Sequence, residues 1–84
     1  MKVSIGGVDY KIRKIKVGEM LPMLPRFETD QVNVQRDMVA SCVSLANSDE
    51  SLGDKVDDLD WEVYSKLSVK VLEANGFSSG LGND

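Results

Sequence analysis

Apolar and polar residues alternate at the start of the chain in two short runs, residues 3–5 and 8–12. Strict alternation is typical of a strand with one buried face. Gly6 and Gly7 separate the runs and tolerate the positive φ angles of a tight turn, so we predict a β-hairpin. A phosphate-binding loop needs the longer pattern GxxxxGK[ST] leading into a helix, whereas here a second strand follows.

The alternation ends before the segment VGEMLPMLPRF, residues 17–27. Gly18 is a suitable N-cap for one short turn of helix, and Pro25 is expected to end it. We therefore predict a helical turn followed by an irregular link. Pro22 and Pro25 have the spacing of a polyproline ligand for an SH3 domain, but the apolar residues around them favour a link anchored to the core.

Steps of three and four residues between apolar positions predict an amphipathic helix that Thr29 or Asp30 caps and that runs to about Ala46 or Asn47. Its apolar stripe consists of Val34, Met38, Val39, Cys42, Leu45 and Ala46. Burial of this stripe against other elements is what stabilises such a helix.

The segment NSDESLGDKVDD that follows, residues 47–58, is polar and acidic. We predict a solvated loop in which Leu52 and Val56 reach back towards the domain. Its carboxylates are hard oxygen ligands of the kind that calcium takes. Their spacing does not match the calcium-loop pattern, however, so the solvated loop is the interpretation that we favour.

A last periodic segment predicts a second main helix, capped by Asp58 or Asp60. One face of it carries Trp61, Tyr64, Leu67, Ser68, Val71 and Leu72. Asn75 and Gly76 are expected to end this helix in left-handed geometry, with Phe77 folded back on its final turn.

These elements predict an α+β fold in which an N-terminal β-hairpin is followed by a short helical turn and two main α-helices packed together. We expect residues 1–77 to form a single globular domain and residues 78–84 to be a flexible C-terminal tail. A chain of 84 residues buries a modest core, so oligomerisation or a partner would add to its stability.

The amino-acid composition limits the kinds of catalysis that the chain could support. The chain has one cysteine and no histidine, so neither a Cys–His nor a Ser–His pair is available for nucleophilic catalysis. Cys42 lies on the predicted apolar stripe and is expected to be a small buried hydrophobe. We find no run of apolar residues long enough to span a membrane and no signal peptide, which predicts a soluble, intracellular protein. We also expect the protein to have no cofactor and no bound metal.

Charge is distributed unevenly along the chain. Residues 1–27 carry six basic and two acidic side chains, whereas residues 28–62 carry two basic and ten acidic ones. The basic residues of YKIRKIK fall on both faces of a strand, and no aromatic platform or helix–turn–helix pattern accompanies them. We therefore expect protein partners of complementary charge and no nucleic acid.

A protein partner requires an accessible apolar surface. Flexible methionines suit an adaptable groove, and Met20 and Met23 lie beside the prolines, with Met38 as a third candidate that is also suited to the core. Our candidate groove lies between the MLPML link and the two main helices, and Trp61 and Tyr64 are either core or partner-facing. The candidate protein-binding residues are Met20, Leu21, Met23, Leu24, Phe27, Trp61 and Tyr64.

Several short strings together resemble the small tail assembly chaperones of long-tailed bacteriophages, in the lambda-like and HK97-like group. They are the glycine-turn hairpin with YKIRKI, the segment VGEMLPMLP, the acidic loop and the final VLEANGF, which cover residues 2–77. The resemblance implies a non-catalytic protein of the host cytoplasm, from a phage or prophage, that self-associates. It also implies that the protein binds the tape-measure protein and helps recruit tail-tube subunits.

Two other classes of function stay open from the residues alone. The acidic stretch of residues 28–62 suits a small adaptor or inhibitor module that docks a basic protein partner, and strong salt dependence of binding would favour it. An enzyme would need paired carboxylates in a cleft, such as Asp57 with Asp60 or Glu62. These carboxylates lie in or beside the predicted solvated loop, so we rank the enzyme last.

Overall fold

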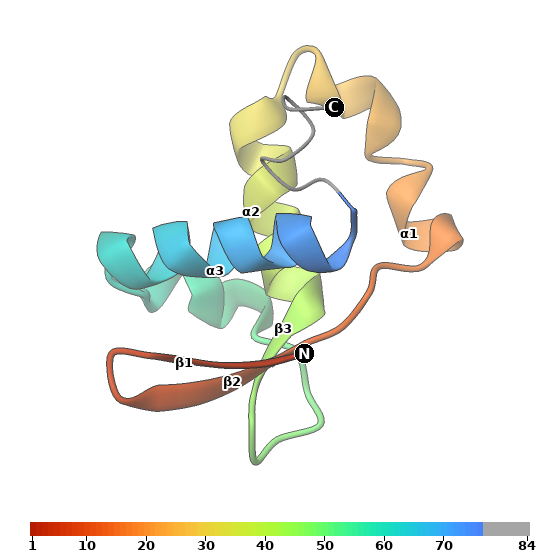
Figure 1. Cartoon of the computed structure of the whole chain (residues 1–84). Helices are drawn as coiled ribbons and strands as arrows, with labels where there is room; N and C mark the ends of the chain where they lie inside the picture. Colours follow the sequence, from red (N-terminus) through yellow and green to blue (C-terminus); the bar gives the residue numbers. More distant parts are fainter. Residues whose placement is uncertain (77–84) are drawn as a thin grey trace.

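The computed structural model describes residues 1–76. An antiparallel sheet, in the order β1 (Lys2–Ile5), β2 (Val8–Ile12), β3 (Val43–Leu45), packs with two main helices, α2 (Gln31–Cys42) and α3 (Trp61–Ala74). Shorter helical turns connect these elements (Figure 1). The predicted α+β class, with an N-terminal hairpin and two main helices packed together, is confirmed. The predictions for Phe77 and for the tail at residues 78–84 lie outside the described residues.

The hairpin forms as the alternation predicts. β1 (Lys2–Ile5) pairs antiparallel with β2 (Val8–Ile12), and Ile5 lies opposite Val8. Gly6 and Gly7 have φ angles of 61° and 80°, the left-handed geometry that a two-residue hairpin turn with the twist of a sheet requires. The inward side chains Ile5, Tyr10 and Ile12 are buried.

The third strand was not predicted. Helix α2 (Gln31–Cys42) ends four residues before the expected Ala46, and β3 (Val43–Leu45) then pairs with β2, with Val43 opposite Ile12. An isolated hairpin is marginal in water, and a third strand satisfies the second edge of β2 while it buries Val43 completely. Val-Ser-Leu alternates like a strand, so tertiary pairing overrides its helical spacing.

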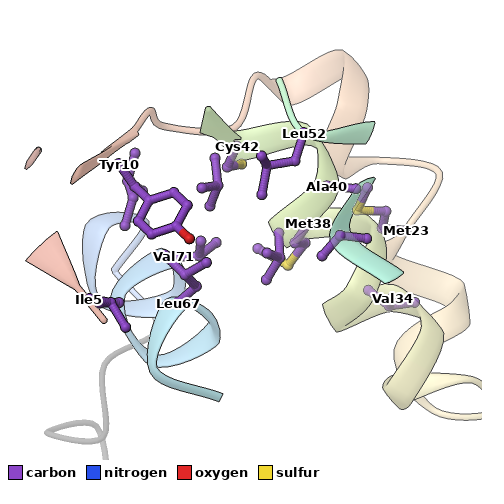
Figure 2. Close-up of a cluster of buried hydrophobic side chains, with 14 residues drawn as sticks. Ile5, Tyr10, Met23, Val34, Met38, Ala40, Cys42, Leu52, Leu67 and Val71 are labelled. Atoms are coloured by element: carbon purple, nitrogen blue, oxygen red, sulfur yellow. The ribbon is translucent and has the colours of Figure 1, made fainter. Parts of the chain in front are cut away.

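Side chains from the sheet, α2 and α3 (Trp61–Ala74) share one core (Figure 2). The largest fully buried side chains are Met38, Leu67, Val34, Val39, Val43 and Val71. The predicted stripe of α2 is thus confirmed as far as Cys42, while Leu45 lies at the exposed edge of β3. On α3 the buried positions are Leu67 and Val71, one helical turn apart.

The short turns differ from the prediction at their ends. Helix α1 (Val17–Met20) has Lys16 and not Gly18 as its N-cap, because the Glu19 carboxylate reaches back to accept a hydrogen bond from the Lys16 N–H at 3.0 Å. Pro25 lies inside the first turn of a 3₁₀ helix, η1 (Leu24–Phe27), rather than ending a helix, since the missing N–H of proline is not needed there.

The acidic segment folds back on the domain. It contains a 3₁₀ helix, η2 (Gly53–Asp58), which packs on α2. Leu52 and Val56 are both buried, as predicted. At the end of α3, Gly76 has the expected left-handed φ of 82°, whereas Asn75, with a φ of −106°, does not adopt this geometry.

Among residues 1–76, none of the helices has both the length and the apolar character needed to traverse a lipid bilayer.

Candidate protein-binding surfaces

The structure divides the predicted binding residues into two groups. Five of them lie on the segment from α1 to η1, and Met20 borders a hollow beside the last turn of α3. Trp61 and Tyr64 lie on the first turn of α3 and line another hollow. The two hollows therefore lie at opposite ends of α3, which has 14 residues and ends about 20 Å apart (Figure 1).

The first surface is a groove between α1 and the end of α3, with a volume of about 610 Å³. We call it the α1 groove; it is lined by Lys14, Ile15, Val17, Met20, Glu73, Ala74, Asn75 and Gly76. Its apolar wall is partly accessible, since Val17 is 72% exposed and Met20 is half-buried. Helix α2 does not contribute to it.

Asn75 fixes the floor of the α1 groove. Its side-chain oxygen accepts a hydrogen bond from the Ile15 N–H at 2.7 Å, and its amide nitrogen donates to the Val71 carbonyl at 2.9 Å. One side chain therefore joins the chain entering α1 to the end of α3, across 60 residues of sequence. Both bonds are partly buried, which raises the cost of losing them.

The α1–η1 segment has an inner and an outer side. Met23 is buried in the core and Phe27 packs partly against it, whereas Leu21 and Leu24 are 59% and 49% exposed. Figure 2 draws Met23 among the core side chains of α2. In this fold Met23 is an anchor of the segment, and Leu21 and Leu24 are the side chains that an incoming partner would meet.

An ion pair between Arg13 and Glu19 links α1 to the chain that precedes it. The Arg13 guanidinium donates two hydrogen bonds to the Glu19 carboxylate, at 2.9 and 2.8 Å. These bonds, with the bond from the Lys16 N–H, lower the pKa of Glu19 from its usual 4.5 to about 2. The helical turn that carries the exposed apolar residues is thus held by charge as well as by Met23.

The second surface, which we call the Trp61 patch, consists of Val32, Leu59, Trp61 and Tyr64. Val32 and Trp61 are each 78% exposed, and Leu59 and Tyr64 are half-buried. The rings of Trp61 and Tyr64 lie with their centroids 5.6 Å apart and their planes 33° from each other. All four residues line one hollow of about 280 Å³ between α2, η2 and α3, with Val56 beneath them.

Arg36 forms the charged wall of this hollow. Its guanidinium donates to both carboxylate oxygens of Asp57, at 3.0 and 2.8 Å, and to Asp54 and Asp37 at 3.2 Å each. The bonds raise the pKa of Arg36 and lower that of Asp57. Arg36 therefore stays in one orientation beside the aromatic rings, which makes the hollow a preorganised site.

Acidic residues at the end of η2 and the start of α3 are neighbours of the Trp61 patch in the sequence, and Asp57 lines its hollow. Asp57, Asp58, Asp60 and Glu62 fall within six residues of sequence and are all exposed. Asp57 is paired with Arg36, and Glu62 lies 3.1 Å from Lys66. The patch thus combines large apolar side chains with a negative rim.

Sequence reasoning missed Val32. It lies two residues from Val34 on α2 and so points to a different side of the helix from the buried stripe. A large apolar residue on the polar face of an amphipathic helix is the signal that would have found it.

Two further candidates for chemistry are the thiol of Cys42 and the acidic side chains. Cys42 is buried, as predicted, and desolvation raises the pKa of its thiol. No group of three or more acidic or cysteine side chains within residues 1–76 is arranged to hold a metal ion.

Comparisons with protein-family models, with curated proteins and with solved structures find no match to this chain.

Proposed function

We propose that the chain is a non-catalytic tail assembly chaperone of a phage or prophage, and that it binds an amphipathic helix of the tape-measure protein through the Trp61 patch. The observation that carries the proposal is the 78% exposure of both Trp61 and Val32 around one preformed hollow. Burying such side chains contributes about 25 cal/mol per Å², so a partner that covers them gains binding free energy.

The make-up of the Trp61 patch supports protein binding over small-molecule binding. Tryptophan, tyrosine and arginine are the residues that most often dominate the energy of protein interfaces, and Trp61, Tyr64 and Arg36 meet here. A hollow of about 280 Å³ accepts a large side chain of a partner but is small for a cofactor. Helix-in-groove binding uses such hollows to receive apolar anchors.

The identity of the client comes from the resemblance of the sequence to phage tail chaperones. A tape-measure protein is long and helical, and its apolar stripes need cover before the tail tube assembles. In this proposal the chaperone acts in the host cytoplasm, self-associates along the tape-measure protein and helps recruit tail-tube subunits. The exposed Leu21 and Leu24 offer a second apolar surface for those further contacts.

Calorimetric titration with a helical fragment of the tape-measure protein from the same genome tests the proposal. Trp61→Ala is expected to weaken binding at least 30-fold, since a central aromatic anchor contributes about 2 kcal/mol or more. Val69→Ala is the matched control, because Val69 is an exposed apolar residue of the same helix outside the patch. Equal affinity of both variants and the wild type would exclude the Trp61 patch as the client site.

The single tryptophan provides a readout that needs no label. Because Trp61 is exposed in the free protein, its fluorescence emission should shift to the blue when a tryptophan-free client fragment covers it. An unshifted spectrum at saturating client would contradict the proposal.

The adaptor or inhibitor that docks a basic partner remains the second candidate, and the acidic rim of the Trp61 patch favours it. The two candidates differ in their response to salt. Binding dominated by exposed charge pairs weakens strongly between 50 and 500 mM salt, because the Debye length falls from about 14 to 4 Å. Binding dominated by apolar burial changes little over this range, and that is the result expected for the chaperone.

A further inference from the structure

The face of the sheet that turns away from the core carries a row of cationic and hydroxyl side chains that the proposed function does not use. Strand pairing places Lys2 opposite Lys11, Lys11 opposite Ser44, and Ser44 opposite Ser51. The row, which we call the lysine row, crosses all three strands and the segment beside β3. With strands about 4.8 Å apart, it spans roughly 14 Å.

The lysine row borders a hollow of about 400 Å³, to which Ser41, Asp49 and Arg13 also contribute. Arg13 is engaged by Glu19, as described above, so its charge is already balanced. The hollow therefore offers hydroxyl donors from three serines and the ammonium groups of two lysines.

The pairing of Lys2 with Lys11 has a cost for the fold. Like charges directly opposite each other on neighbouring strands repel and destabilise the sheet. Within residues 1–76, the one carboxylate within 4 Å of the Lys11 ammonium is that of Asp49, at 3.5 Å, and the Asp49 side chain is fully exposed. A ligand with further carboxylates would relieve the repulsion that remains.

We propose that the lysine row binds an acidic, carboxylate-bearing segment of a partner protein. Carboxylate oxygens accept hydrogen bonds both from lysine ammonium groups and from serine hydroxyls, and the row presents these donors side by side. Asp49 on Lys11 is an intramolecular example of the same contact. The chain carries a net charge of −4, which repels a polyanion such as nucleic acid more strongly than it repels a short segment with a few carboxylates.

Fluorescence anisotropy with a labelled peptide of alternating glutamate and serine tests the proposal. The double variant Lys2→Gln/Lys11→Gln is expected to lose at least tenfold in affinity. Lys55→Gln/Lys66→Gln is the matched control, because it removes the same net charge from η2 and α3, and it should stay within threefold of the wild type. Equal losses of affinity in the two double variants would mean that binding depends on net charge alone, and this result would overturn the proposal.

A second pair of variants tests the site from the opposite direction. Asp49→Asn removes the carboxylate that competes for Lys11 and should tighten peptide binding by roughly two- to fivefold, whereas Asp58→Asn makes the same change in net charge away from the row. Unchanged or weaker binding by Asp49→Asn would contradict the assignment.

Stability and competition complete the test. The thermal midpoint of Lys2→Gln/Lys11→Gln should equal or exceed that of the wild type, because the variant removes a repulsion; a lower midpoint would show that these lysines serve the fold. The glutamine counterpart of the peptide should not bind. If inorganic phosphate or a short DNA duplex displaced the peptide at equal concentration, the row would bind anions in general and not carboxylates in particular. This result would overturn the proposal.

Discussion

The α1–η1 segment and the Trp61 patch are both rich in large apolar side chains, yet the fold treats them differently. In the α1–η1 segment Met23 is 9% exposed and anchors the chain to the core, with its neighbour Leu24 turned outwards. In the Trp61 patch the largest side chain, Trp61, is 78% exposed, and smaller residues such as Val56 lie beneath it. The position of a side chain relative to α2, and not its hydrophobicity, decides whether it serves the core or an interface.

The strongest test of the difference between buried Met23 and exposed Leu24 is to replace each of them in turn by a charged residue. Met23→Asp puts a carboxylate into an apolar core and is expected to cost about 3–5 kcal/mol, which is a large part of the stability of a small domain. Leu24→Asp, one residue away and 49% exposed, should change the free energy of unfolding by about 0.5 kcal/mol or less. Urea denaturation followed by circular dichroism measures both.

Met23→Ala keeps the comparison measurable if the aspartate variant does not fold. It should lose about 2–5 kcal/mol through lost burial and the cavity left behind. Similar stabilities for Met23→Ala, Leu24→Asp and the wild type would mean that Met23 is not an anchor, and that the inner and outer sides of the segment do not differ.

A smaller loss of stability is expected when the hydrogen bonds between Asn75 and the α1 groove are removed. Asn75→Ala removes the acceptor of the Ile15 N–H and the donor to the Val71 carbonyl, so a partly buried N–H is left without its partner. We expect a loss of about 1–3 kcal/mol. The Trp61 patch at the far end of α3 should keep its fluorescence spectrum, which restricts the change to one region.

Asn47→Ala is the control for this variant, because Asn47 is an exposed loop residue. It should stay within about 0.5 kcal/mol of the wild type. If Asn75→Ala changed the free energy of unfolding as little as Asn47→Ala, the Asn75 side chain would not be what fixes the chain that leads into α1.

The sequence predicted most of the fold, and the exceptions have physical causes. The alternation around Gly6-Gly7 and the spacing on α2 and α3 identified the hairpin, both helices and most of the core. The third strand was missed because Val43 and Leu45 also fit the helical spacing, and only the open edge of β2 favours the strand.

The candidate surfaces were less predictable than the fold. The segment from Met20 to Phe27 was recognised as apolar, but no local pattern tells that Met23 faces α2 while Leu24 faces outwards. Trp61 belongs to the predicted apolar face of α3, but it lies about 80° around the helix from the buried Val71 and about 120° from Leu67, and this position at the start of the helix leaves it exposed. The lysine row joins residues from four separate segments, which strand pairing alone brings together.

The smallest expected effect concerns the charge that holds α1. The pKa of Glu19 is about 2 in the folded protein and 4.5 in its usual state, so the folded protein favours the ionised form. A lowered folded pKa adds stability that is complete above pH 4.5 and is lost as the pH falls from 4.5 to about 2. Because both partners are partly exposed, solvent screening limits the contribution to about 1 kcal/mol or less.

Glu19→Gln isolates this contribution. The difference in unfolding free energy between wild type and Glu19→Gln should be constant from pH 7 to pH 5 and shrink towards zero near pH 2. Glu50→Gln, which removes one exposed loop carboxylate, should differ from the wild type by about 0.5 kcal/mol or less at pH 7. A difference for Glu19→Gln that does not change with pH would mean that the Arg13 contact is not ionic, and α1 would then be held by Met23 and Asn75 alone.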